Sequence, residues 1–144
     1  MSVKVKNISL WRKEVENKPG VLAQTLETLT RTGADLHVVM GYRYPGDETK
    51  AAIELYPVTG KKSLAAAQQA GLVSSSIPTL LVEGKNKPGL GYALAQAIAE
   101  AGVDLSFLIA QVIGRKYSAV IGFVTQRDAE KAKALIKKAV SKKK

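Results

Sequence analysis

The tetrapeptide Asn-Lys-Pro-Gly at Asn17–Gly20 decides the architecture, because it occurs again at Asn86–Gly89. The interval between the two copies is close to half of the 144-residue chain. Aligning Asn17–Val39 with Asn86–Leu108 gives seven identities in 23 positions, whereas average composition gives on the order of one match in 15 by chance. The pattern indicates an internal duplication, and two copies are too few for a solenoid. We therefore expect two small αβ units.

Composition excludes several classes of function. The chain has no cysteine and one histidine, so it can form no disulfide framework and no cysteine-based metal site. It carries no nucleophile elbow, phosphate loop or dinucleotide fingerprint. No stretch is long and apolar enough to span a membrane. We expect a cytoplasmic protein with no cofactor and no bound metal that is not an enzyme.

The formal charge of +10 suggests a nucleic-acid partner, but its distribution does not. Half of the charge comes from five lysines in the last eight residues, and no basic run is interleaved with aromatic residues. Lysines at a helix end also complement its dipole. We expect Ser141–Lys144 to be mobile and dispensable for folding, and we do not expect a nucleic-acid partner.

Hydrophobic periodicity predicts the same order of elements in both halves. In the first half the expected elements are a strand, a helix, two strands and a helix that Ser63 caps: Val5–Arg12, Val21–Thr32, Leu36–Tyr42, Ala51–Leu55 and Leu64–Ala70. In the second half they follow the same order, with Asp128 as the last N-cap: Thr79–Glu83, Leu90–Ala101, Asp104–Ile113, Tyr117–Thr125 and Asp128–Ala139.

The order β-α-β-β-α, with Leu72–Ser76 as a short further strand, is the split βαβ or ferredoxin-like pattern. The predicted fold class is α+β, with two ferredoxin-like (βαββαβ) units that form one antiparallel sheet with helices packed on one face. The predicted domains are the repeats 1–73 and 74–144.

The duplicated strand–loop–helix junction is the strongest candidate for a binding site. Backbone N–H groups at a helix N-terminus lack partners and attract anions, and glycine lets a ligand approach them. Gly20 and Gly89 supply that approach. An amide at Asn17 or Asn86 could add hydrogen bonds. Carboxylates at the starts of the next strands, from Asp35 and Asp104, could accept from an ammonium group. Alternatively, these residues only make tight turns and caps.

The motif Asn-Lys-Pro-Gly-(Val/Leu), a three-turn helix and then Gly-x-Asp-Leu resembles the ACT domain, a small ligand-sensing βαββαβ module. The likeness covers both halves, so the chain resembles free-standing tandem ACT proteins. The resemblance implies that amino acids bind where the loop of one unit meets the second strand of a paired unit. The implied ligand-binding residues are Asn17, Pro19, Gly20, Val21, Leu22, Asp35, Leu36, Asn86, Pro88, Gly89, Leu90, Gly91, Asp104 and Leu105.

The chain departs from the family two residues before each loop asparagine. Some amino-acid-sensing members carry a polar side chain there, whereas this chain has Val15 and Gly84. The predicted function is a regulatory small-molecule-binding protein, a homodimer that senses an amino acid and transmits it to a partner enzyme or regulator. Two alternatives stay open: an ACT-type scaffold for protein–protein contacts that binds no ligand, and a basic nucleic-acid adaptor.

Overall fold

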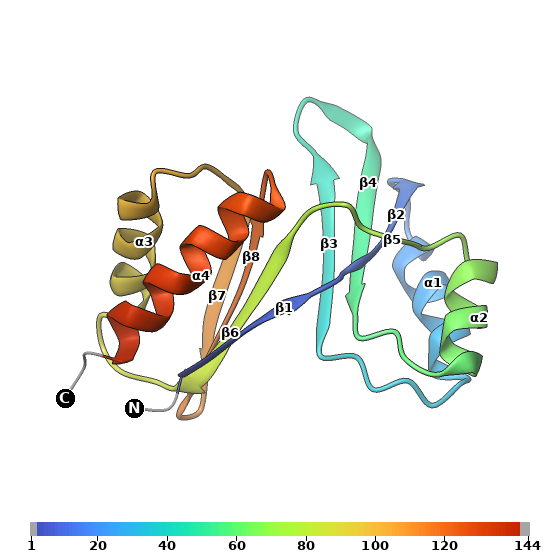
Figure 1. Cartoon of the computed structure of the whole chain (residues 1–144). Helices are drawn as coiled ribbons and strands as arrows, with labels where there is room; N and C mark the ends of the chain where they lie inside the picture. The colour runs from blue at the N-terminus through green and yellow to red at the C-terminus, as the bar shows by residue number, and fades with distance from the viewer. Residues whose placement is uncertain (1–2, 142–144) are drawn as a thin grey trace. The chain divides into compact units, whose positions relative to one another are not determined.

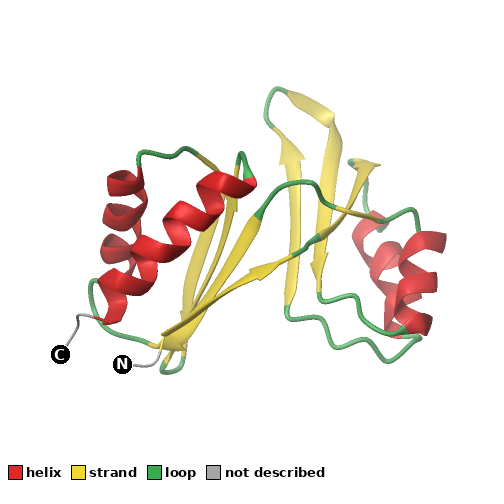
Figure 2. Cartoon of the chain, in the orientation of Figure 1, coloured by secondary structure: helices red, strands yellow, loops and turns green. Residues whose placement is uncertain are grey.

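The computed structural model describes residues 3–141. Residues 142–144, which make up most of the tail expected to be dispensable, lie outside the described residues. The chain divides into two compact units. One is the continuous segment Ser9–Ser76, here called the inserted unit, and the other combines Met1–Ile8 with Ile77–Lys144 and is here called the split unit. Each unit is ferredoxin-like, an antiparallel sheet with two helices on one face (Figures 1 and 2).

The inserted unit has the strand order β3-β4-β2-β5, and all of its neighbouring strands are antiparallel. Helices α1 and α2 pack on the face of the sheet that carries Ile53 and Leu55. The core of this unit is small, and its most deeply buried members include Leu29 and Leu72. Its elements are β2 (Trp11–Glu16), α1 (Val21–Thr30), β3 (Val38–Tyr44), β4 (Asp47–Tyr56), α2 (Lys61–Gln69) and β5 (Val73–Ser74).

The split unit has the equivalent strand order, β1-β6-β8-β7. Strand β1 lies antiparallel beside β6, the position that β5 takes beside β2 in the inserted unit. Its Val5 joins the core, and Asn7 accepts a hydrogen bond of 2.7 Å from Lys133 of the last helix. The elements are β1 (Val3–Ile8), β6 (Thr79–Lys85), α3 (Leu90–Ala101), β7 (Leu105–Ile113), β8 (Lys116–Phe123) and α4 (Gln126–Ser141).

The structure corrects the expected first strand and the expected single sheet. The predicted strand Val5–Arg12 is two strands, β1 and β2, and the described strands form two four-stranded sheets. Residues 13–16, which lie beyond the predicted strand, belong to β2. In this strand Trp11 and Val15 face the core, while Arg12 and Glu14 project from the opposite face. The charges hide this alternation in the sequence. The repeat boundaries 1–73 and 74–144 describe the duplication of the sequence, and they stay a prediction.

Two predicted caps are also wrong. Helix α4 begins at Gln126. Thr125 caps it, because its hydroxyl oxygen accepts a hydrogen bond of 3.0 Å from the backbone N–H of Asp128. Helix α2 begins at Lys61, so Ser63 lies inside it, and its hydroxyl meets that of Thr32 at 2.9 Å. The predicted fold class and element order are otherwise confirmed. Within residues 3–141, no helix is long and apolar enough to cross a membrane.

We expect Val5→Ala to destabilise the split unit by about 1–2 kcal/mol, because it removes buried methyl groups from the core beneath α4. The exposed neighbour Lys4→Ala is the matched control and should change stability little. Hydrogen exchange of the β6 and β8 amides measures the effect. Faster exchange in β2 and β4 instead would mean that β1 belongs to the other sheet.

Candidate functional site

The two Asn-Lys-Pro-Gly loops fold alike. Gly20 has φ 89° and ψ −12°, and Gly89 has φ 87° and ψ −2°, a left-handed conformation that glycine adopts without strain. The backbone N–H groups of Asn17 and Asn86 donate hydrogen bonds of 2.8 Å to the backbone carbonyls of Thr49 and Arg115, respectively. Among the described residues, no side chain caps α1 or α3, and neither helix has an acidic residue in its first turn. The positive end of each helix dipole therefore has no acidic side chain within the first turn.

A pocket of about 230 Å³ opens beside the first of these loops, inside the inserted unit. It lies between the loop and first turn of α1 on one side and strands β3 and β4 on the other. Its lining residues are Val15, Glu16, Asn17, Lys18, Val21, Leu22, Gly41, Tyr42, Arg43, Ala51, Ala52 and Ile53.

The pocket combines an apolar floor with a charged rim. Aliphatic side chains such as Val15 and Ile53 form the floor, and Gly41 leaves space because it has no side chain. A Cβ atom on Gly41 would lie 3.9 Å from Leu22 Cδ2, at ordinary contact distance. The rim carries Lys18 and Arg43, and Lys18 Nζ lies 3.3 Å from a Glu16 carboxylate oxygen. This combination suits a small zwitterion or anion with an apolar part.

Of the predicted residues in the first half, Asn17, Val21 and Leu22 line this pocket. The other four do not: Pro19, Gly20, Asp35 and Leu36. Asn17 also has a structural role, since its Nδ2 donates to the carbonyl of Glu48 at 2.9 Å.

The strand-start residues lie away from the loop. Asp35 faces His37 at 3.3 Å, and Leu36 packs against the core of the inserted unit. Asp35 lies three residues before β3, which starts at Val38, and neither Asp35 nor Leu36 lines the pocket. Asp35 is therefore not part of this pocket within its own unit.

In the second half, Asn86, Pro88 and Gly89 form the equivalent loop. Leu90 is buried in the core, and a Cβ atom on Gly91 would lie 3.7 Å from the hydroxyl of Tyr117. Asp104 and Leu105 stand at the start of β7 with exposed side chains. The predicted residues of this half therefore lie in two places, the loop with the first turn of α3 and the start of β7, as in the first half.

The sequence did not indicate the half of the pocket lining that comes from β3 and β4. One available signal was Gly41 inside a strand, since an interior glycine often marks close approach of a ligand or backbone. The small pair Ala51 and Ala52 was another, because small side chains in a strand leave room above it. Both signals acquire meaning only once the register of β3 with β4 is known.

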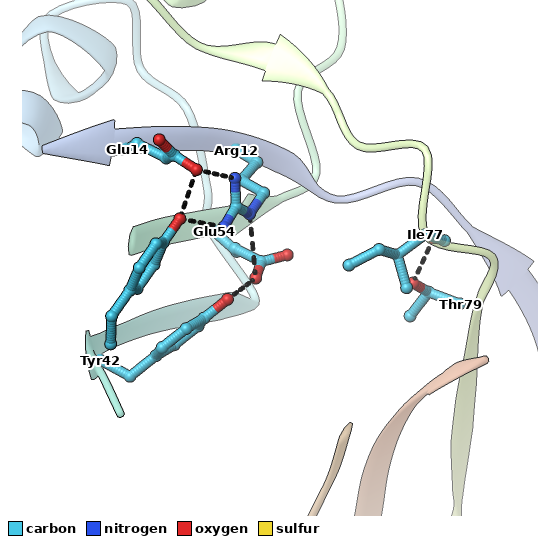
Figure 3. A network of polar contacts seen from close by, with 7 residues as sticks. Arg12, Glu14, Tyr42, Glu54, Ile77 and Thr79 are labelled. Atoms are coloured by element: carbon cyan, nitrogen blue, oxygen red, sulfur yellow. Dashed lines mark hydrogen bonds and ion pairs between the residues drawn. The ribbon is translucent and has the colours of Figure 1, made fainter. Parts of the chain in front are cut away.

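The sequence also missed a polar network on the sheet of the inserted unit (Figure 3). Glu54 is fully buried (0% exposed) and accepts a hydrogen bond of 2.6 Å from Tyr42. Arg12 donates to the Tyr44 hydroxyl at 2.6 Å, and its Nε lies 3.8 Å from Glu54 Oε2. Tyr44 in turn donates to Glu14 at 2.5 Å. The network therefore ties β2, β3 and β4 together.

The network sets the protonation of its members. Burial, and then the hydrogen bond to Glu54, raises the pKa of Tyr42. The hydrogen bond from Tyr44 lowers the pKa of the Glu14 carboxyl, and the same contact raises the pKa of Tyr44. Both tyrosines are therefore neutral donors and Glu14 is an ionised acceptor at neutral pH. Because Tyr42 also lines the pocket, the network holds one of the pocket walls in place.

Comparison with known proteins gives similar folds at low sequence identity. Protein BT0572 from Bacteroides thetaiotaomicron has a TM-score of 0.73 and 16% identity, over 93% of this chain and 89% of that one. The regulatory subunit of aspartate kinase from Thermus thermophilus has a TM-score of 0.62 and 16% identity, over 96% of this chain and 97% of that one. A structure of aspartokinase alpha and beta subunits has a TM-score of 0.63 and 15% identity, over 98% of both chains.

No protein-family model matches the chain, and no curated protein matches it. At these identities the structural likenesses show the fold alone. They support the α+β, ferredoxin-like fold of the ACT type that the sequence predicted.

We expect Glu54→Ala to lower the free energy of unfolding by about 2–4 kcal/mol, because it leaves Arg12 and Tyr42 without their buried partner. The exposed Glu14→Ala should cost less than about 1 kcal/mol. Urea unfolding followed by the fluorescence of Trp11, the only tryptophan, measures both. Equal losses in the two variants would contradict a structural role for the buried carboxylate.

Proposed function

We propose that this chain is a regulatory module of the tandem ACT type that binds an amino acid and transmits its presence to a partner protein. The single observation that carries the proposal is the pocket of about 230 Å³ at the first Asn-Lys-Pro-Gly loop. It is smaller than the roughly 300–1,000 Å³ of sites for drug-sized ligands, and a metabolite of amino-acid size suits it.

The chemistry of the pocket supports a zwitterionic ligand. The uncapped first turn of α1 supplies backbone N–H groups and the positive end of a helix dipole for a carboxylate. Lys18 and Arg43 add positive charge at the rim, and Glu16 offers a carboxylate to an ammonium group. The floor around Val15 and Ile53 accepts an aliphatic side chain. Asp35 and Asp104 stay candidates for contacts made by a second, paired unit.

The comparisons support a regulatory role. The aspartate kinase regulatory subunit from Thermus thermophilus matches over nearly the whole of both chains, so a chain of this size and fold exists as a regulatory subunit. By analogy, we propose that this chain is cytoplasmic, is not itself an enzyme, and acts on an enzyme or regulator. The proposal includes a duplication of the sequence into repeats 1–73 and 74–144, whereas the folded ACT-like units are Ser9–Ser76 and Met1–Ile8 with Ile77–Lys144.

Strand β7 supports association between two copies. It is an edge strand of nine residues without a charged side chain, and its apolar residues Leu105, Leu108, Ile109, Val112 and Ile113 are 39–69% exposed. An exposed apolar edge with unpaired backbone groups readily pairs with another strand. An uncharged strand can pair with a second copy of itself without like-charge repulsion. We propose a homodimer in which two β7 strands lie antiparallel; the scaffold alternative uses the same surface.

Amino-acid binding is tested by calorimetry of the full chain against each of the twenty amino acids. Gly41→Val should abolish the heat of binding, because the new side chain enters the pocket in front of Leu22. The fold should tolerate it, since valine suits a strand. The matched control is Ala110→Val, at the equivalent position of the second repeat in β7, which should bind normally. The absence of heat with any amino acid on the parent chain would favour the scaffold alternative.

The dimer is tested by sedimentation at several protein concentrations. Ile109→Lys places a charge in the β7 edge and should weaken dimerisation at least about 100-fold, because two lysines would then approach each other across the interface. The control Tyr92→Lys changes an exposed aromatic residue on α3 and should leave the dimer intact. A parent chain that stays monomeric near 100 μM (roughly the range of weak dimers) would contradict the proposal.

A further inference from the structure

Two positions in the units are equivalent but carry very different side chains. Ala51 in β4 pairs with Val15 on one side and Arg43 on the other. Tyr117 in β8 pairs with Gly84 and Val112. Gly84 follows Val15, and Val112 follows Arg43, by the same interval that separates the two Asn-Lys-Pro-Gly loops. Ala51 and Tyr117 therefore occupy the same place in their own sheets.

The helix residue that faces this position also differs in size between the units, but in the opposite order. Leu22 in the first turn of α1 corresponds to Gly91 in the first turn of α3, again at the interval between the loops. In the inserted unit a large residue on the helix stands opposite a small one on the strand. In the split unit the helix residue is small and the strand residue is large.

Tyr117 occupies the space beneath α3. Its side chain is only 6% exposed and belongs to the core that contains Leu90 and Leu94. Its hydroxyl approaches Gly91, where a Cβ atom would lie 3.7 Å away. A buried tyrosine covers roughly 150–250 Å² of surface, so its ring fills a volume that alanine leaves open. Burial also raises the pKa of the Tyr117 phenol, as expected for a ring enclosed by apolar neighbours.

We infer that the split unit is plugged by its own Tyr117, whose ring takes the place that a small molecule takes in the inserted unit. The chain then has one ligand site for two Asn-Lys-Pro-Gly loops, and the loop at Asn86–Gly89 keeps its shape without binding. This inference rests on the proposed function only in assigning a ligand to the open pocket. The plug itself follows from register and burial. It separates the roles of the units, with binding in one and association through β7 in the other.

The decisive variant is Ala51→Tyr in the full chain, which transfers the plug to the inserted unit. It should lose at least 100-fold in affinity for whichever of the twenty amino acids binds the parent. The control Val73→Tyr, which adds a tyrosine at an exposed position of β5 outside the pocket, should keep the affinity. The new phenol should titrate above the ordinary pKa near 10 in an ultraviolet absorbance titration. If Ala51→Tyr does not fold, Ala51→Leu fills much of the same space and should show the same loss.

The reciprocal variant, Tyr117→Ala, should open a cavity beneath α3. The probe is p-cresol, which is the tyrosine side chain without its backbone. Because apolar engineered cavities bind small aromatic molecules, p-cresol should raise the melting temperature of this variant by about 2–4 °C. It should leave the parent unchanged, and likewise Tyr92→Ala, which removes an exposed tyrosine from α3.

The outcomes separate this inference from the proposed function. Two ligand sites per parent chain, or unchanged affinity in Ala51→Tyr, would overturn the plug. If no amino acid binds the parent, the proposed function fails and the plug is decided by the other two readouts. An ordinary phenol pKa in Ala51→Tyr together with no p-cresol effect on Tyr117→Ala would then overturn it.

Discussion

The antiparallel pairing of β1 with β6 is the constraint on which the rest of the structure depends. Val3–Ile8 run along 79–84 and cover an edge of β6 whose backbone groups would otherwise lack partners. With β1 used there, the inserted unit must start its sheet with Trp11–Glu16. That strand ends directly at the Asn-Lys-Pro-Gly loop, so its end forms one side of the pocket. Beside β6, β1 thereby takes the place that β5 takes beside β2 in the inserted unit.

The left-handed glycines explain why the two loops are alike in backbone although the side chains beneath their helices differ. Gly20 and Gly89 turn the chain into a helix in the same way, and the strands pair in the same register in both units. Backbone geometry therefore does not decide which loop can bind. In our proposal the side chains beneath the helix decide it, Ala51 in one unit and Tyr117 in the other. The same fold thus accommodates either a small or a large side chain at this position.

The edge strands β3 and β7 also differ between the two units, in the polarity of their side chains. Strand β3 carries Tyr42, Arg43 and Tyr44 and is held to β2 and β4 by the network around Glu54. Strand β7 carries no charge and exposes a row of aliphatic side chains. A polar, fixed edge suits a binding site, because its pocket wall must keep its shape. An apolar edge suits association, because burying it removes apolar surface from water.

The sequence by itself determined the order of elements, the fold class and the two glycine turns, because these depend on local periodicity and on the conformational freedom of glycine. It identified Asn17, Val21 and Leu22 of the pocket, which follow one another along the chain. Only the tertiary structure decided the partner of β1, the burial of Glu54 and the part of the pocket lining that comes from β3 and β4. These depend on strand register between distant segments, which local patterns do not fix. The charges of β2 hid its alternation, since a strand with one polar face resembles a loop when its partners are unknown.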